Sequence, residues 1–344
     1  MILAICAMAS SIVFAGQSPQ SIDFSSLEKN INQTKLLSRL LSGTAIAVIK
    51  DDKIIYQGNF GYANIANKQK VTNTTPFYIA SATKPFFALN TLLDINASKI
   101  QQTLTLNVMF PTLDVPEIDE QQVTLKHLLT HTSAIDNIPL VFATAFSGVH
   151  NSESLKQLVL NESVKTNNGV GEFKYTNVGY NIFSVFADEY FEKPWQQRLQ
   201  QQIFSPLSMS LTSAQMSTLN NKNIAVAKPY SLMVPTQPNS LYLEKVNQTM
   251  HSAGGMVSTT TDLAQFIIAQ LNAGVIDNKQ VFPAQVIKES QQKQVETDAS
   301  YLDFKRDGYA WGWYTGNYKD KRMLHHFGGF DGAHAHMSFL PEHH

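Results

Sequence analysis

The first part of the chain places apolar residues at a helical period and then at a strand period. Residues 24–41 space leucines and an isoleucine among polar residues, which predicts an amphipathic helix that ends at Gly43. Residues 44–49 and 53–58 are two β-rich runs separated by a pair of aspartates, which predicts a hairpin. Residues 77–90 follow as a short apolar run that continues into an apolar helical pattern.

The middle of the chain has a different character, because longer helical patterns are joined by loops rich in Asn, Gln, Ser and Pro. The predicted helical segments are residues 123–133, 177–190 and 195–203. Strand-like patterns return late in the chain, at 309–314 and 323–340.

This order of elements predicts an α/β (α+β) fold in which an antiparallel sheet is flanked by helices. Residues 22–99 and 250–344 are expected to form the sheet domain, and residues 100–249 a mostly helical second domain. A chain of 344 residues with 43% hydrophobic content can bury cores of this size. The net charge of -1 provides no basic surface for nucleic acid, so no nucleic-acid partner is expected.

Residues 1–16 are interpreted as a signal peptide. Residues 1–15 are uncharged and mostly apolar, with small residues near the expected cleavage point at Ala15, although the usual basic start is lacking. The stretch is too short to span a bilayer, so no stable membrane span is predicted and the protein is expected to be secreted, in the periplasm. The single cysteine, Cys6, lies within it, which leaves a mature chain without thiols or disulfides. Lipid attachment at Cys6 is the alternative, which the preceding Ile5 disfavours.

Ser81 and Lys84 form a Ser-x-x-Lys motif at the start of the helical pattern in residues 77–90. Residues three apart on a helix project from the same face, so the amine can reach the hydroxyl. We interpret Ser81 as a nucleophile and Lys84 as its base, provided that burial lowers the pKa of the lysine. A helix that begins at Ser81, with Pro85 in its first turn, would also direct free N–H groups toward a developing oxyanion.

Two more motifs offer groups able to do chemistry. Tyr175-x-Asn177 places a phenol beside an amide that can orient a substrate or a lysine. The glycine-rich stretch 325–332 lies in strand-forming sequence, where glycine usually marks close backbone approach. Each motif is weak alone, but their order along the chain is informative.

In this order, Ser81-x-x-Lys84, Tyr175-x-Asn177 and His326-x-Gly328, the motifs resemble those of the serine β-lactamase and penicillin-binding-protein superfamily. The branch of class C β-lactamases and D,D-carboxypeptidases is the most similar. Three flanking segments also match, at 128–133, 203–209 and 252–259. The resemblance covers residues 24–341 and implies a serine hydrolase with an acyl-enzyme, no cofactor, and a site in the cleft between sheet and helical domain.

The resemblance implies a catalytic role for three residues. Ser81 is acylated, and Lys84 and Tyr175 form the proton-transfer pair. The substrate class that it implies is an amide or ester: a D-amino-acid peptide, which includes peptidoglycan-derived peptides, a β-lactam or a simple ester.

The resemblance implies substrate-binding roles for the other motif residues. Asn177 positions the substrate amide, and His326 and Gly328 line the strand beside the pocket. The backbone N–H groups of Ser81 and Gly329 form the oxyanion hole.

Two departures from the family pattern change the expectations. His326 stands where class C β-lactamases have a lysine, so a titratable group replaces a fixed cation, which favours peptidase, amidase or esterase activity. The family also continues with a further strand and a closing helix beyond the residues present here. The chain is either a fragment or has a sheet that lacks one strand, which would leave an exposed edge.

Two alternatives remain open. Six histidines in the last 20 residues allow a metal site, since His334-x-His336 has a spacing that zinc sites use, but no Asp or Cys follows at matching spacing. The second alternative is a non-catalytic penicillin-binding-like protein that keeps the fold and recognises peptidoglycan.

Overall fold

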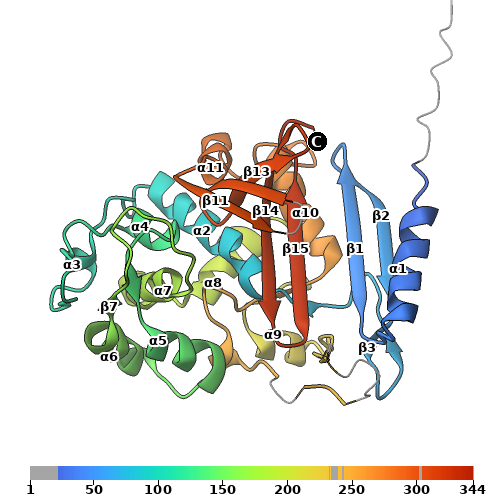
Figure 1. The fold of residues 1–344 in the computed structure, drawn as a ribbon, viewed down its shortest axis with the longest axis horizontal. Coiled ribbons are helices and arrows are strands. Elements are labelled where there is room, and N and C mark those ends of the chain that lie inside the picture. The colour runs from blue at the N-terminus through green and yellow to red at the C-terminus, as the bar shows by residue number, and fades with distance from the viewer. Residues whose placement is uncertain (1–21, 232, 234–238, 242–243, 302–303, 344) are drawn as a thin grey trace, which may run out of the picture.

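A five-stranded antiparallel sheet forms one side of the molecule (Figure 1). The computed structural model describes residues 22–231, 233, 239–241, 244–301 and 304–343, and the predicted signal peptide lies outside them. The strands pair in chain order: β11 (Val295–Tyr301), β12 (Phe304–Tyr309), β13 (Tyr314–Tyr318), β14 (Lys321–Phe330) and β15 (Ala333–Phe339).

The predicted N-terminal hairpin is confirmed. Its strands are β1 (Thr44–Lys50) and β2 (Lys53–Phe60), and both aspartates of the turn have positive φ, which two-residue hairpin turns require. The predicted helix is also confirmed as α1 (Ser25–Leu37), although it ends six residues before Gly43. None of its side chains is fully buried, so α1 lies on the surface of the hairpin, with Phe24 stacked on Tyr56.

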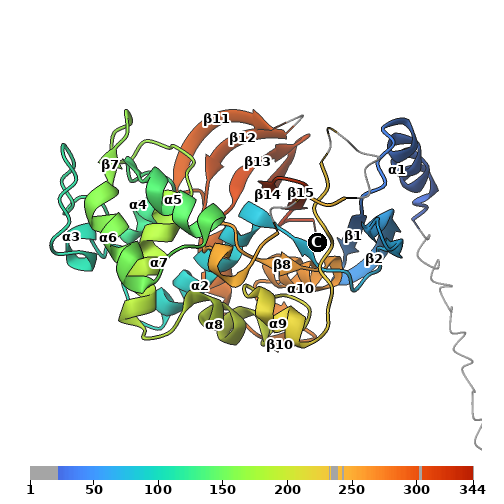
Figure 2. The ribbon, with the colours of Figure 1, turned by 90° about the horizontal axis from the view of Figure 1, so that it is seen from below.

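The helix α2 (Lys84–Asn96) lies at the centre of the molecule, beneath the sheet in Figure 2. It is apolar on nearly every side, as expected of a helix that packs on all faces. Phe86 stacks on Phe266 of α10 (Thr260–Leu271), and Phe87 meets Phe183 of α7 (Val178–Tyr190) edge on. The helix is therefore the rigid support on which Ser81 and Lys84 are mounted.

The remaining described helices and strands are short. The helices are α3 (Leu106–Met109), α4 (Leu125–Leu129), α5 (Ile138–Phe142), α6 (Ser152–Glu162), α8 (Trp195–Leu199), α9 (Met216–Asn221) and α11 (Ala284–Ser290). The strands are β3 (Tyr62–Asn64), β4 (Gln69–Lys70), β5 (Phe77–Tyr78), β6 (Ile135–Asp136), β7 (Val164–Lys165), β8 (Val257–Ser258), β9 (Val275–Ile276) and β10 (Lys279–Gln280). Helices α3 to α7 gather on the side of α2 away from the hairpin (Figure 1). The domain boundaries at 99/100 and 249/250 stay a prediction.

The predicted strand at 309–314 is wrong. β12 ends at Tyr309 and β13 begins at Tyr314, and the residues between them form a tight turn around Gly312, whose φ is +81°. Trp311 and Trp313 in this turn are completely buried, so their apolar pattern reflects core packing. The backbone of Gly312 lies against Pro85, where a Cβ atom would come within 2.6 Å, so the turn fits closely on the start of α2.

The hairpin and the large sheet face each other across a gap. Among the described residues, β1 pairs only with β2, and β15 pairs only with β14. A cavity of about 720 Å³ lies between these two edges and is also lined by α1 and α10. The expected exposed strand edge is therefore present in the part of the chain that the structure describes.

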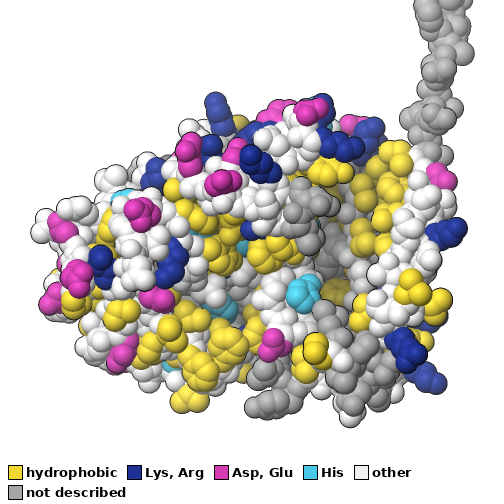
Figure 3. Space-filling model, viewed as in Figure 1, with side chains coloured by type: hydrophobic (Ala, Val, Ile, Leu, Met, Phe, Trp, Pro, Cys, Tyr) yellow, Lys and Arg dark blue, Asp and Glu magenta, His cyan; other side chains and the backbone are white. Residues whose placement is uncertain are grey.

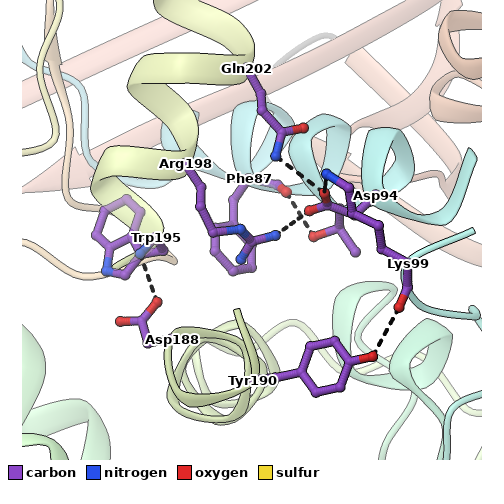
Figure 4. A network of polar contacts seen from close by, with 9 residues as sticks. Phe87, Asp94, Lys99, Asp188, Tyr190, Trp195, Arg198 and Gln202 are labelled. Carbon is purple, nitrogen blue, oxygen red and sulfur yellow. Dashed lines mark hydrogen bonds and ion pairs between the residues drawn. The ribbon is translucent and has the colours of Figure 1, made fainter. Parts of the chain in front are cut away.

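A buried ion pair joins the far end of α2 to α8 (Figure 4). The Asp94 carboxylate accepts a hydrogen bond from Arg198. The Asp94 side chain is 1% exposed and the Arg198 side chain is 3% exposed. Gln202 and Lys99 also donate to Asp94, at 3.2 Å and 3.3 Å. Within the described residues, every helix is too short or too polar to cross a bilayer.

Candidate active site

Ser81 lies in a short 3₁₀ turn, Ala80–Thr83, that directly precedes α2. The predicted α-helical start at Ser81 is therefore wrong by one turn, since the α-helix begins at Lys84. The 3₁₀ geometry almost eclipses side chains three residues apart, which brings Lys84 directly over Ser81. Ala80 has a φ of +45°, a strained value for a residue with a Cβ, and this sharp entry turns the Ser81 side chain away from the core.

Lys84 is completely buried, and its amine has three close polar neighbours. The Nζ atom lies 3.2 Å from Ser81 Oγ, 2.8 Å from Asn177 Oδ1 and 2.8 Å from the carbonyl oxygen of Ala253. The two carbonyl oxygens can only accept, so they take two N–H donors. A neutral amine then directs its lone pair at the Ser81 hydroxyl, which is the geometry of a base.

Burial lowers the pKa of Lys84 well below its usual value. Among the described residues, no carboxylate lies within 4 Å of its amine to offset this effect. The condition set by the sequence for Lys84 to act as a base is therefore met.

Tyr175 and Asn177 meet at the same amine. The amine of Lys84 lies 4.8 Å from the centre of the Tyr175 ring, and Asn177 supplies the amide oxygen described above. Asn177 occupies the N-cap position of α7 but makes no side-chain cap, because its amide faces Lys84 instead. Burial raises the pKa of Tyr175, and the Ser81 hydroxyl acts in the opposite direction. The Tyr175 side chain is therefore a neutral phenol near pH 7.

His326 is buried next to Tyr175 and does not present a charge to the site. Its side chain has no exposed surface, and its Nε2 lies 3.2 Å from the hydroxyl of Tyr309. Burial, with a smaller effect from Lys84, lowers the pKa of His326 well below its usual value. The expectation that a titratable group takes the place of the fixed cation is therefore wrong, because the sheet and the neighbouring tyrosines exclude water from the ring.

Gly328 and Gly329 bring strand β14 against the Ser81 turn. A Cβ atom on Gly328 would lie 1.9 Å from the carbonyl oxygen of Ile79 and 2.9 Å from the amide nitrogen of Ala82, so only glycine allows this contact. Gly329 is exposed and follows directly along the strand. The backbone predicted to supply the second oxyanion donor therefore runs beside the nucleophile.

Two further residues at the site were not predicted from the sequence. The carbonyl of Ala253 accepts from Lys84, and Gly255 allows the tight turn behind it, where a Cβ atom would meet the amide nitrogen of His251 at 2.1 Å. His131 packs its ring 4.6 Å from that of Tyr175, and its Nδ1 accepts from the amide of Thr176. Both residues lie in segments that match the family, at 252–259 and 128–133, but those matches assigned neither residue a role in the site.

The C-terminal histidines do not assemble into a metal site within the described residues. His325 and His326 point to opposite faces of β14, as successive strand residues do. His325 contacts His336 at 3.3 Å, but no group of three metal-ligating side chains comes together in the described ranges.

Comparisons with known proteins agree with this arrangement. The family profile described as "Beta-lactamase" matches residues 27–344. "Protein flp" of Staphylococcus aureus (strain COL) is 23% identical over 292 residues, which cover 85% of this chain and 55% of that protein. "Penicillin-binding protein 4*" of Bacillus subtilis (strain 168) is 24% identical over 306 residues, which cover 85% of this chain and 63% of that protein. The chain thus spans little more than half the length of these relatives.

Among solved structures, the octameric penicillin-binding protein homologue from Pyrococcus abyssi is similar, with a TM-score of 0.78 at 19% identity. The match covers 94% of this chain and 72% of that one. At this identity the likeness concerns the fold alone, and it confirms the predicted mixed fold of antiparallel sheet and helices.

Proposed function

Because the chain belongs to the beta-lactamase family, we propose that it is a serine hydrolase that forms an acyl-enzyme with amide or ester substrates. The observation that carries this proposal is the buried amine of Lys84, 3.2 Å from Ser81 Oγ, with two carbonyl oxygens in position to hold its N–H groups. A lysine without a counter-charge in a dry environment is a poor structural element and a good base.

In the proposed reaction, Ser81 Oγ attacks the substrate carbonyl carbon while Lys84 Nζ accepts the hydroxyl proton. The backbone N–H groups of Ser81 and Gly329 stabilise the oxyanion that forms. The Tyr175 phenol donates its proton to the leaving nitrogen or oxygen as the bond to the acyl carbon breaks, and Lys84 returns a proton to Tyr175. Water then attacks the acyl carbon and releases the acid and free Ser81.

The buried His326 supports a narrower proposal about the substrate. A neutral ring without exposed surface cannot pair with the carboxylate of a β-lactam as the lysine of class C β-lactamases does. We therefore propose that D-amino-acid peptides, other amides or esters are turned over faster than β-lactams, within the class C and D,D-carboxypeptidase branch.

The test is intact-protein mass spectrometry after incubation with a fluorescent penicillin, a D-Ala-D-Ala peptide and a short-chain ester. We expect an adduct on Ser81 with the penicillin and turnover of the peptide or the ester. Ser81→Ala is the matched control and should show neither. A folded wild-type protein without any adduct or turnover would instead support a non-catalytic protein that recognises peptidoglycan.

We also propose that the protein acts outside the cytoplasm, because residues 1–15 resemble the apolar part of a signal peptide. Sequencing the N-terminus of the protein recovered from a periplasmic extract should find cleavage near Ala15. Recovery from the cytoplasm with residue 1 intact would contradict this proposal.

A further inference from the structure

Lys245 places a second ammonium group within a ring of aromatic side chains. Its Nζ lies 3.8 Å from the centre of the Phe330 ring, 5.3 Å from that of Tyr78 and 5.6 Å from that of Phe146. We call these three rings with Lys245 the Lys245 cage. Such cation–π contacts hold an ammonium in place without neutralising it.

The Lys245 cage adjoins the candidate active site through two segments of chain. Tyr78 lies three residues before Ser81, and Phe330 directly follows Gly329 on β14. The two rings contact each other edge to face at 5.5 Å, so they join strand β5, which precedes Ser81, to strand β14, which carries Gly329.

The ammonium of Lys245 makes one hydrogen bond within the described residues. One N–H is directed at the carbonyl oxygen of Ala145, and its other two donors have no partner in these ranges. Among the described residues, Lys245 forms no ion pair, and the adjacent Glu244 pairs with Lys228 at 2.6 Å. Lys84 is fully engaged and His326 is buried, so neither presents a charge to a substrate.

An exposed apolar surface continues from the Lys245 cage. Phe146 stacks on Phe142 of α5 with 5.8 Å between ring centres, and it contacts Phe330 at 5.7 Å. Phe146 is 44% exposed and Phe142 is 60% exposed. Figure 3 shows hydrophobic side chains gathered over the α5 region. Contiguous exposed aromatic residues are typical of a surface that binds a ligand.

We propose that the Lys245 cage is a substrate subsite that binds a carboxylate carried on an apolar or aryl part of the substrate. The carboxylate would accept the two remaining N–H donors of Lys245, and the apolar part would pack on Phe146 and Phe142. This subsite rests on the proposed function, because it selects among the amides and esters that Ser81 attacks.

The test compares two para-nitrophenyl esters whose acyl groups differ at one position. One carries a para-carboxyphenylacetyl group and the other a para-methylphenylacetyl group. In the wild type, kcat/KM should favour the carboxylate ester by about tenfold, the size of one or two charge-assisted hydrogen bonds at a partly exposed site. Lys245→Met should bring this ratio close to one, and Lys245→Arg should retain most of it. Lys279→Met, on the exposed strand β10, is the control and should keep the wild-type ratio.

A binding measurement separates this subsite from the catalytic proposal. The para-carboxyphenylacetamide and para-methylphenylacetamide are titrated into Ser81→Ala by ligand-observed NMR, with and without Lys245→Met. Tighter binding of the carboxylate that disappears with Lys245→Met supports the subsite even if no ester is turned over. Equal affinity of the two amides in Ser81→Ala would overturn the subsite, whether or not Ser81 is a nucleophile. Circular dichroism of each variant confirms folding, and if Lys245→Met does not fold, Lys245→Gln takes its place.

Discussion

Two buried ionisable side chains, Lys84 and Asp94, lie ten residues apart on the same helix, α2, and only one of them has a partner of opposite charge. Asp94, near its end, faces Arg198, Lys99 and the amide of Gln202. Lys84, at its beginning, is equally buried but meets only a hydroxyl and two carbonyl oxygens. The first centre has its counter-charge and the second does not.

This difference indicates which centre holds the fold together and which is available for chemistry. Removing a buried carboxylate that is bonded to a guanidinium leaves an uncompensated buried charge. A buried amine without a carboxylate loses its proton more easily than an exposed one, which favours its neutral form. Burial therefore has opposite consequences at the two ends of α2, and each can be tested separately.

The largest effect is expected from Lys84→Met, which replaces the amine by an apolar chain of similar length. The rate of acylation of Ser81 should fall roughly a thousandfold, because the hydroxyl loses its base. Stability near neutral pH should change little, because the methionine avoids the cost of burying the amine, which offsets the loss of its hydrogen bonds to Asn177 and Ala253. Stopped-flow acylation with a fluorescent penicillin measures the first quantity, and urea unfolding measures the second. An unchanged acylation rate would show that Lys84 is not the base.

Asp94→Ala is expected to lower stability strongly and to change the acylation rate little. The free energy of unfolding should fall by about 3–5 kcal/mol, because Arg198 is left buried and unpaired. Acylation by the protein that remains folded should stay within about twofold of the wild type, since Asp94 lies three turns from Ser81. Urea unfolding, with acylation rates measured well below the transition, gives both values.

The matched control is Lys99→Ala, which removes the partner of Asp94 whose side chain is 52% exposed. An exposed ion pair contributes about 0–1 kcal/mol, so this variant should be close to the wild type. If Lys99→Ala were as destabilising as Asp94→Ala, the assignment of the stability to the buried Arg198 pair would be wrong.

A smaller effect is expected in the pH dependence of stability. The pKa of Lys84 is well below 10.5 in the folded protein and near 10.5 in the unfolded chain, so between these values the unfolded chain binds one more proton. The free energy of unfolding therefore rises with pH in this window, by up to about 1.4 kcal/mol per pH unit. Below the folded pKa both states are protonated and the slope vanishes.

The measurement is the difference in unfolding free energy between the wild type and Lys84→Met from about pH 6 to about pH 9. As the pH rises, the free energy of unfolding of the wild type should increase relative to that of Lys84→Met. The contributions of other groups cancel in this difference. Parallel curves for the two proteins would mean that the pKa of Lys84 is not lowered by folding.

Much of the local structure could be predicted from the sequence, and the failures share a cause. The hairpin, α1, α4 and α7 follow from period and turn residues, which are properties of adjacent positions. The run at 309–314 was predicted as a strand because its aromatic residues suit a sheet, but Gly312 turns the chain to pack Trp311 and Trp313 into the core. Tertiary burial and strand pairing produce the same apolar pattern there, so the pattern could not separate them.

For the site, the sequence by itself determined the proximity of Ser81 and Lys84, because three-residue spacing on a helical turn brings two side chains together in any fold. Only the tertiary structure decided that Asn177 and the carbonyl of Ala253 accept hydrogen bonds from the Lys84 amine. It also decided that His326 is buried in the core. Those outcomes depend on which segments pack around each group. The cost of removing a charge from water is set by its three-dimensional neighbours, and no spacing along the chain encodes it.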